Sequence, residues 1–251
     1  MQQLSVVIIT LNEERNIRSC LESVRSVADE IIVVDSGSTD GTLGICEEMG
    51  IAAVQQSWLG YAAQKNFANA LASNDWILSL DADEALSGEL KTSVLEWKKG
   101  PATPAAFARL TNYCGKFVRH GGWYPDTKIR IFNRLNTSWS GTLHETLTGL
   151  SLSDCRLLKG DCIHYSFHTL SDHLRQIDRF STIGAKALHE KGKRGTLLKI
   201  LYKPVGRFLR NYVIHAGFLD GLTGLIIAIN SAHAVFLKYL RLYYLYKDKV
   251  V

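Results

Sequence analysis

Short apolar runs and amphipathic segments alternate along the first third of the chain. Leu4 to Thr10 is β-branched and almost wholly apolar, as expected of a strand that is covered on both faces in a parallel sheet. Apolar residues then recur at helical spacing between Ile17 and Val24, and a second apolar run extends from Ile31 to Val34. A buried strand is predicted again at Trp76 to Leu80. This alternation predicts an α/β fold with a doubly wound, mostly parallel sheet and flanking helices.

The pattern changes after a helix predicted at residues 87–98. Strand-like segments follow, then a helix with one apolar face from Leu170, and a final region rich in Tyr, Phe, Leu and Arg. The strand-like segments are Ala105 to Tyr113, Thr127 to Phe132 and Arg156 to His164. We therefore predict one domain over residues 1–168, divided near residue 100, and a helical C-terminal region over residues 169–251.

Polar and acidic residues stand at the ends of the predicted strands. The segments are Thr10-Leu-Asn-Glu13, Asp35-Ser-Gly37 and Asp81-Ala-Asp83-Glu84. Ligands of doubly wound sheets bind beyond the carboxyl ends of the strands. Carboxylates that follow a buried strand either cap the next helix or hold a hard divalent cation through oxygen ligands. One D-x-D pair is weak evidence, but the three segments together favour a ligand site.

Composition and charge limit the class of protein. With 251 residues and 46% hydrophobic composition, the chain can bury a full core, so disorder is not expected. The five cysteines are scattered and lack a C-x-x-C pair, which indicates reduced thiols in a cytosolic protein. From Lys159 onward, 15 Lys and Arg stand against 6 Asp and Glu. Such a basic, aromatic tail suits nucleic acid or anionic lipid, and its long apolar stretches favour lipid.

Neither end of the sequence predicts a membrane-spanning helix. The N-terminus lacks a basic segment, and its apolar run is too short for a signal peptide. Leu222 to Leu237 is largely apolar and uncharged, but it is shorter than the roughly 18 residues that a spanning helix requires. We therefore expect a peripheral protein on the inner face of the cytoplasmic membrane, with an anionic membrane surface and no nucleic acid as partner.

Three segments of the first domain resemble family 2 glycosyltransferases, which have the GT-A fold. They are Val7-Ile-Ile-Thr-Leu-Asn-Glu-Glu14, Ile31-Ile-Val-Val-Asp-Ser-Gly-Ser-Thr-Asp-Gly-Thr42 and Asp75-Trp-Ile-Leu-Ser-Leu-Asp-Ala-Asp-Glu84. Four more segments are similar to bacterial glucosyltransferases that extend the inner core of lipopolysaccharide. These are Gly121-Gly-Trp-Tyr-Pro125, Lys128-Ile-Arg-Ile-Phe132, Gly141-Thr-Leu-His-Glu145 and Gly217-Phe-Leu-Asp-Gly221. The resemblance implies an inverting enzyme that moves a hexose, glucose from UDP-glucose, to an inner-core heptose.

The same resemblance assigns residues to the nucleotide-sugar donor. It places residues 1–100 on the donor side and residues 101–168 on the acceptor side. The donor-binding set is Thr10, Asn12, Glu13, Asp35, Lys65, Asp81 and Arg130. Three of these have simpler alternatives: Asn12 as a helix cap, Lys65 on the exposed face of an Ala-rich helix, and Arg130 as a solvated residue of a strand.

Metal, catalytic and acceptor residues are also implied. A divalent cation, Mg²⁺ or Mn²⁺, is expected on Asp83 and Asp81, with His164 as a further ligand or a structural residue. Glu145 is expected to be the base that deprotonates the acceptor. Because His144 precedes it directly in the sequence, the roles of the two residues in that step stay open. Trp123 and Tyr124 stack on an acceptor sugar or pack as loop anchors.

Three alternative functions remain. The acceptor is another lipid-linked glycan, such as a polyprenyl-linked or capsule intermediate, or the chain is a non-catalytic membrane-binding protein on a transferase fold. The retained Asp81-Ala-Asp83 and Glu145 argue against the non-catalytic alternative. A nicotinamide dehydrogenase is disfavoured, because no G-x-G-x-x-G follows the first strand.

Overall fold

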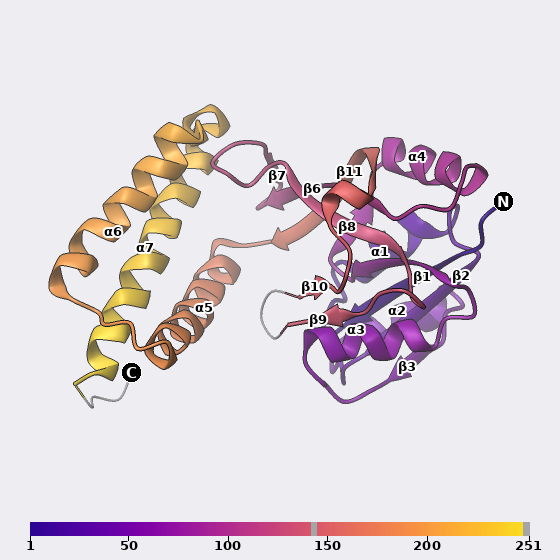
Figure 1. Ribbon diagram of the computed structural model, residues 1–251, viewed down its shortest axis with the longest axis horizontal. Helices are drawn as coiled ribbons and strands as arrows, with labels where there is room; N and C mark the ends of the chain where they lie inside the picture. The colour runs from indigo at the N-terminus through magenta and orange to yellow at the C-terminus, as the bar shows by residue number, and fades with distance from the viewer. Residues whose placement is uncertain (142–144, 248–251) are drawn as a thin grey trace. The chain divides into compact units, whose positions relative to one another are not determined.

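The computed structural model describes residues 1–141 and 145–247, which form two compact units (Figure 1). The first unit comprises Met1–Arg109 and Asp126–Tyr165, and the second comprises Leu110–Pro125 and the chain from Ser166 onward. The chain passes between the units within strands β6 (Ala105–Tyr113) and β11 (Arg156–Phe167). The domain boundary expected near residue 168 stays a prediction.

A mixed sheet forms the centre of the first unit, with strand order β3-β2-β1-β4-β8-β6-β11-β5. The strands are β1 (Leu4–Thr10), β2 (Glu30–Asp35), β3 (Ala53–Gln55), β4 (Trp76–Asp81), β5 (Glu84–Leu86) and β8 (Asp126–Asn133), and β7 (Lys116–Val118) pairs with β6. Strands β3, β2, β1 and β4 are parallel, whereas β8 is antiparallel to β4 and β6, and β5 is antiparallel to β11. The α/β class is confirmed. Only the half with helical crossovers is parallel, because short connections such as β6-β7-β8 favour antiparallel pairing.

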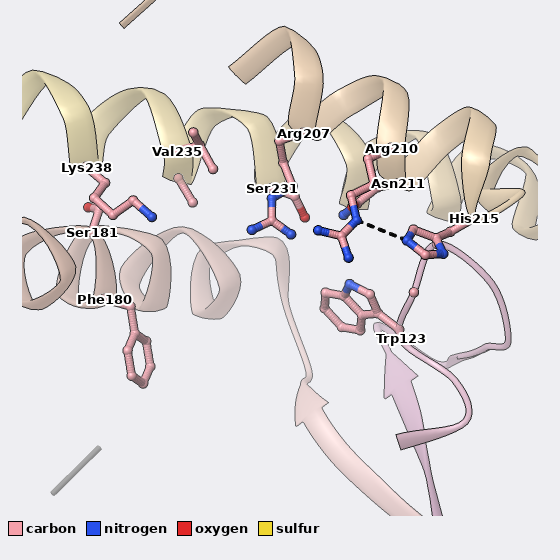
Figure 2. Close-up of a pocket in the computed structure, with 13 residues that line it drawn as sticks. Trp123, Phe180, Ser181, Arg207, Arg210, Asn211, His215, Ser231, Val235 and Lys238 are labelled. Atoms are coloured by element: carbon pink, nitrogen blue, oxygen red, sulfur yellow. Dashed lines mark hydrogen bonds between the residues drawn. The ribbon is translucent and has the colours of Figure 1, made fainter. Parts of the chain in front are cut away.

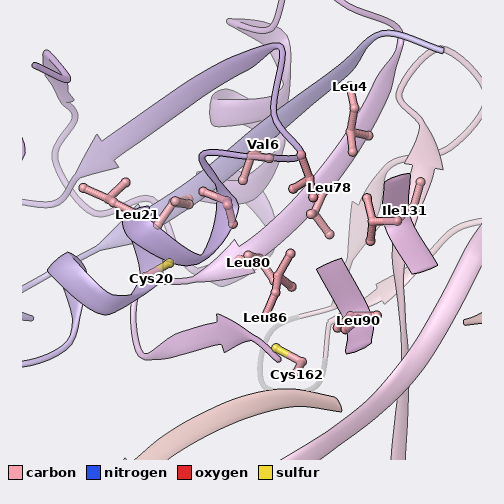
Figure 3. Close-up of a cluster of buried hydrophobic side chains, with 14 of the residues drawn as sticks. Leu4, Val6, Cys20, Leu21, Leu78, Leu80, Leu86, Leu90, Ile131 and Cys162 are labelled. Atoms are coloured by element: carbon pink, nitrogen blue, oxygen red, sulfur yellow. The ribbon is translucent and has the colours of Figure 1, made fainter. Parts of the chain in front are cut away.

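Helices cover both faces of this sheet. They are α1 (Ile17–Val24), α2 (Thr42–Glu48), α3 (Tyr61–Ala70) and α4 (Gly88–Lys99). Val6 of β1 belongs to a core cluster with Leu21 of α1 and Leu90 of α4 (Figure 3). Its neighbour Val7 belongs to a second cluster with Ala68 of α3. Successive residues of a strand point to opposite faces, so the apolar run at β1 is buried on both sides, as its sequence predicts.

A short hairpin of β9 (Trp139–Ser140) and β10 (Thr146–Leu147) lies beside the main sheet. Trp139 and Leu147 pack in the same core cluster as Ala68, and Asn66 of α3 exchanges two hydrogen bonds with the Trp139 backbone. A 3₁₀ turn, η1 (Leu152–Asp154), follows. The hairpin matters for function because Glu145 immediately precedes β10 and is therefore held next to α3.

The second unit is mainly helical (Figure 1). Its elements are α5 (Leu170–Glu190), α6 (Leu197–Leu209), the π-helical turn η2 (Arg210–Ile214), the 3₁₀ turn η3 (Gly217–Asp220) and α7 (Gly221–Leu245). Helix α7 packs against both α5 and α6. A Cβ atom on Gly224 would lie 1.8 Å from the Gly217 carbonyl oxygen, so this approach between α7 and η3 requires glycine.

Helix α7 is longer than the apolar run predicted at its centre. With the preceding turn it extends over Gly217–Leu245, 29 residues, and it is the one helix in the described ranges that is long and apolar enough to cross a membrane. The expectation that this segment is too short to span is therefore wrong, because the helix extends beyond the apolar run at both ends. Length and composition alone do not distinguish a spanning helix from the core helix of a helical unit.

Candidate active site

The carboxyl ends of the parallel strands meet at one edge of the sheet in the first unit. In the register of the sheet, Thr10 pairs with Asp35, and Ile9 pairs with Asp81. The polar segments that follow β1, β2 and β4 are therefore neighbours, as the alternation of elements predicts. The hydroxyl of Thr10 is buried at this edge and has no hydrogen-bond partner among the described residues. A buried hydroxyl without a partner is costly, and a water molecule or a ligand at this edge would supply the missing partner.

The loops after β1 and β2 are joined by side-chain hydrogen bonds. Asn12 has a positive φ of 54°, its Oδ1 accepts from Thr39 N at 2.8 Å, and its backbone N donates to Ser38 Oγ at 2.8 Å. The alternative that Asn12 caps a helix is wrong, because α1 begins only at Ile17. Asn12 instead shapes the two loops at which the donor is expected.

Asp35 is completely buried at the end of β2. Its Oδ2 accepts hydrogen bonds from Gly37 N and Ser38 N, both at 2.8 Å, and its Oδ1 accepts from Ser38 Oγ at 2.5 Å. Gly37 has φ +96°, a backbone conformation that favours glycine. The carboxylate of Asp35 thus forms the turn of its own Asp-Ser-Gly segment, and its contact with a donor stays a prediction.

Glu13 is half-buried near Asp83, and its pKa is raised to about 7. Burial is the main cause, and the charges of Asp83 and Asp40 add to it, while the hydrogen bond from Asn16 opposes it. A carboxyl group with this pKa changes its protonation state near neutral pH. Contact of Glu13 with the donor stays a prediction.

Lys65 connects two of the expected site residues. Its Nζ lies 3.0 Å from Asp81 Oδ1 and 3.0 Å from Glu145 Oε1, and only 3% of the side chain is exposed. It also lies 4.9 Å from the centre of the Trp139 ring. The alternative that Lys65 is on an exposed helix face is wrong. A buried ammonium group needs such partners, so Lys65 fixes Glu145 beside the end of β4.

Arg130 is the second buried cation of the site. Its Nη2 lies 2.5 Å from Glu84 Oε1 and 3.3 Å from Asp81 Oδ2. The alternative of a solvated strand residue is wrong, since Arg130 is only 4% exposed. Burial alone would raise the pKa of Asp81, but Lys65 and Arg130 beside it hold that pKa well below its usual range. Asp81 is therefore ionised and neutralised by two cations.

Glu84 is a buried residue of the site for which the sequence predicted no role. It is fully buried in β5, and it also accepts from Asp81 N at 3.0 Å and lies 3.4 Å from Arg109 Nη1. Arg109 in turn pairs with Asp126 at 2.7 Å. One feature of the sequence could have predicted this: Glu84 is the third acidic residue of Asp-Ala-Asp-Glu and stands at the start of an apolar segment. A carboxylate that is buried in such a segment needs a partner of opposite charge.

Asp83 and His164 face each other across the end of the sheet. His164 Nε2 lies 3.0 Å from Asp83 Oδ2, and β11 brings His164 into register with Glu84 of β5. Burial alone would lower the pKa of His164, but the charge of Asp83 raises it above its ordinary value. The structure thus brings together two of the three residues expected as metal ligands, from positions far apart in the sequence. No group of three or more His, Cys, Asp or Glu residues arranged to hold a metal occurs in the part of the chain that the structure describes.

The remaining expected residues lie elsewhere. His144 lies outside the described residues. Trp123 and Tyr124 belong to the second unit, where Trp123 packs edge-on against Tyr113 with 6.1 Å between ring centres, and Arg119 lies 5.3 Å from the Tyr124 ring. These contacts match packing as loop anchors. Acceptor binding by Trp123 and Tyr124 stays a prediction.

Comparison with known proteins gives the family. The family model described as glycosyl transferase family 2 matches residues 5–151. An uncharacterised glycosyltransferase of Rickettsia typhi is 31% identical over 96% of this chain and 87% of its own length. The lipopolysaccharide core biosynthesis glycosyltransferase LpsC of Rhizobium meliloti is 29% identical over 96% of this chain and 92% of its own length.

Among solved structures, glucosyl-3-phosphoglycerate synthase from Mycobacterium tuberculosis, in complex with Mn²⁺ and UDP-glucose, is 24% identical with a TM-score of 0.38. That match covers 44% of each chain, so this chain spans less than half of the length of that protein. The family model covers more than half of this chain, and the Rickettsia relative matches nearly all of it. The chain therefore belongs to glycosyltransferase family 2 and is an α/β enzyme of the GT-A type that uses a nucleotide sugar.

Proposed function

We propose that this protein is an inverting glycosyltransferase that moves glucose from UDP-glucose to a heptose of the lipopolysaccharide inner core. The observation that carries the proposal is the contact of Lys65 with both Asp81 and Glu145. It joins a carboxylate at the strand ends, where the donor is expected, to the carboxylate expected to act on the acceptor. The relationship to LpsC, which is named for lipopolysaccharide core biosynthesis, supports the choice of acceptor.

In the proposed reaction, Glu145 is the general base. The acceptor hydroxyl attacks the anomeric carbon of the sugar while Glu145 takes its proton, and the bond from that carbon to the diphosphate oxygen breaks. One displacement of this kind inverts the configuration at the anomeric carbon. Lys65 keeps Glu145 beside Asp81 and adds positive charge near the departing diphosphate. His144 is the other candidate base in this segment.

Asp83 and His164 fit a divalent cation better than Asp81 does. Their oxygen and nitrogen atoms face each other at 3.0 Å, whereas both oxygens of Asp81 contact Lys65 and Arg130. Two protein ligands are enough for Mg²⁺ or Mn²⁺ when substrate phosphates complete the coordination. A cation held by Asp83 and His164 would supply positive charge that stabilises the diphosphate leaving group. Asp81 then orients Lys65 and Arg130 rather than ligating the metal in this conformation.

The second unit supports the proposed location at the inner face of the cytoplasmic membrane. Large apolar side chains are exposed along α6: Leu197, Leu198, Leu201, Tyr202, Val205 and Leu209. Exposed Val213, Ile214, Phe218 and Leu219 continue this set through η2 and η3. Asp220 is the only acidic residue of the sequence between Lys191 and Lys247. Exposed apolar and basic side chains together favour the surface of an anionic membrane.

Sugar transfer with defined donors and acceptors tests the proposal. Purified full-length protein is incubated with Mg²⁺ or Mn²⁺ and UDP-glucose, UDP-galactose, UDP-N-acetylglucosamine or GDP-mannose, with heptose-containing lipopolysaccharide core or with a polyprenyl-linked sugar. We expect UDP release only with UDP-glucose and the heptose acceptor, and its loss in EDTA. Transfer to the polyprenyl acceptor instead would move the function to another lipid-linked glycan. Absence of turnover with every donor would favour the non-catalytic alternative.

A further inference from the structure

A cavity of about 360 Å³ lies entirely within the second unit, among α5, η2, α7 and the loop at Gly121 to Trp123 (Figure 2). Its volume lies within the range of small-molecule sites. The polar side chains around it include Ser181, Arg207, Arg210, His215 and Lys238. No Asp or Glu is among the described residues that line it. The cavity therefore has an excess of positive charge.

The cations of this cavity are not neutralised by the carboxylates of the described residues. In residues 1–141 and 145–247, no carboxylate forms an ion pair with Arg207, Arg210 or Lys238. Arg241, about one turn beyond Lys238 on α7, shows the contrast, because it pairs with Asp178 and also contacts Ser181. Burial lowers the pKa of Lys238, and the positive charges of Arg207 and Lys203 lower it further. An anion in the cavity would relieve this repulsion.

The two arginines are directed into one space. Figure 2 shows Arg207, Arg210 and Trp123 among the side chains that line the cavity. Arg210 Nε donates to His215 Nε2 at 3.2 Å, which orients its guanidinium group. Trp123 is itself fixed by its packing against Tyr113 and Phe167. The cavity therefore places the guanidinium groups of Arg207 and Arg210 together, with that of Arg210 oriented by His215, beside a packed indole ring.

The backbone of the loop also keeps this space open. Gly122 has φ +79°, and a Cβ atom there would meet the His215 ring at 3.4 Å. Gly121 has φ +69°, and its backbone N donates to the His215 carbonyl oxygen at 2.9 Å. Residues with side chains are disfavoured at both positions, so the glycines let the loop approach η2 without filling the cavity.

We propose that this cavity binds a phosphate group. Guanidinium groups match the tetrahedral oxygens of phosphate in paired hydrogen bonds, and Lys238 adds a third positive charge for a dianion. The ligand is either free phosphate or the phosphorylated headgroup of a lipid or lipid-linked glycan. The cavity uses only residues of the second unit, so the inference does not depend on the proposed sugar transfer.

Calorimetric titration of the full-length protein at low salt tests this inference. The probes are inorganic phosphate, short-chain phosphatidic acid with two six-carbon chains, and acetate. We expect saturable binding of phosphate, weaker binding of acetate, and a loss of affinity of about tenfold or more in Arg207→Gln, because one charged hydrogen-bonding group is removed. Lys199→Gln removes the same charge two turns earlier on α6 from a residue that does not line the cavity. We expect phosphate affinity in this control to stay within about twofold of wild type.

The outcomes separate the source of the phosphate from the existence of the site. Tighter binding of short-chain phosphatidic acid than of inorganic phosphate, lost in Arg207→Gln, supports a lipid headgroup. Binding of inorganic phosphate alone, lost in the same variant, supports a free phosphate. Phosphate binding that persists unchanged in both Arg207→Gln and Lys238→Met lies elsewhere in the chain and would overturn the proposal. Equal affinity for acetate would also overturn it, because the site would then not select phosphate.

Discussion

In the first unit, Lys65, Glu84 and Arg130 are almost completely buried, and each contacts a group of opposite charge. In the second unit, Arg207 and Arg210 are exposed, and no carboxylate of the described residues pairs with them. Apolar side chains differ in the same way, since those of β1 are buried and many along α6 are exposed. The first unit pairs these buried charges within the protein, whereas we propose that Arg207 and Arg210 of the second unit bind a partner outside the chain.

This difference determines what substitutions should do. Breaking a buried ion pair leaves an uncompensated charge, which destabilises the fold as well as altering the chemistry. Removing an exposed charge costs little stability and changes mainly the binding of a partner. Variants of the first unit should therefore affect turnover or folding, and variants of the second should affect binding. The following predictions test this comparison.

The largest effect is expected at Glu145. Glu145→Gln keeps the size of the side chain but cannot accept a proton, so kcat should fall by about 10²–10⁴ while donor affinity changes little. Steady-state kinetics and donor titration measure the two quantities. His144→Ala is the matched comparison and should be milder. Near-normal kcat in Glu145→Gln together with an inactive His144→Ala would assign the base to His144 instead.

Glu84→Ala should mainly destabilise the first unit. It removes the carboxylate nearest to the buried Arg130, at a cost of about 3–5 kcal/mol in the free energy of unfolding. Denaturant unfolding measures this cost. Arg175→Ala removes an exposed partner of Asp172 in the second unit and should cost less than about 1 kcal/mol. Equal costs in the two variants would contradict the contrast between the units.

The second unit should respond to pH through His173. Burial lowers the pKa of His173 to about 4, and its Nδ1 lies 2.8 Å from the Tyr113 hydroxyl. An unfolded histidine takes up a proton near pH 6.5, so lowering the pH from about 6.5 to 4 favours the unfolded state by up to about 3 kcal/mol. The free energy of unfolding should fall over this range in wild type and fall less in His173→Gln. The same slope in both proteins would exclude His173 as its cause.

Membrane binding should show the smallest effect per residue. Vesicles containing anionic lipid should bind the protein, and rising salt should release it. Each exposed basic residue contributes about 1 kcal/mol near such a surface, so Lys203→Gln should weaken binding by about fivefold without loss of stability. Sedimentation with anionic and neutral vesicles measures this. Equal partitioning onto neutral vesicles would show that the basic residues do not attach the protein.

The local pattern of apolar residues predicted where helices and strands form better than it predicted which strands pair with one another. The strand at Ala105–Tyr113 follows directly from its apolar residues, and the helix at Ile17–Val24 from its spacing. The direction in which two strands pair depends on the connection between them. The alternation of strands and helices along the sequence therefore did not predict the antiparallel half of the sheet. Helix α7 extends beyond its apolar run because it also packs against α5 and α6.

The site was predictable by residue type but not by contact. The strand-end carboxylates and the family resemblance selected Asp81, Asp83 and Glu145. The contact of Lys65 with Glu145 joins positions 80 residues apart, and no local pattern encodes it. The burial of Arg130 depends on its ion pair with Glu84 of a different strand. The sequence alone therefore could not exclude that Arg130 is a solvated strand residue. The fold of the sheet, and not the neighbouring residues in the sequence, decides which buried charges pair.

The configuration of the transferred sugar tests the central claim most directly. The full-length protein is given UDP-α-glucose and heptose-containing acceptor, and the anomeric configuration of the initial product is determined by NMR before any rearrangement. A single displacement with Glu145 as base gives a β-glucoside. A product with retained α configuration would contradict direct displacement at the site of Lys65, Asp81 and Glu145.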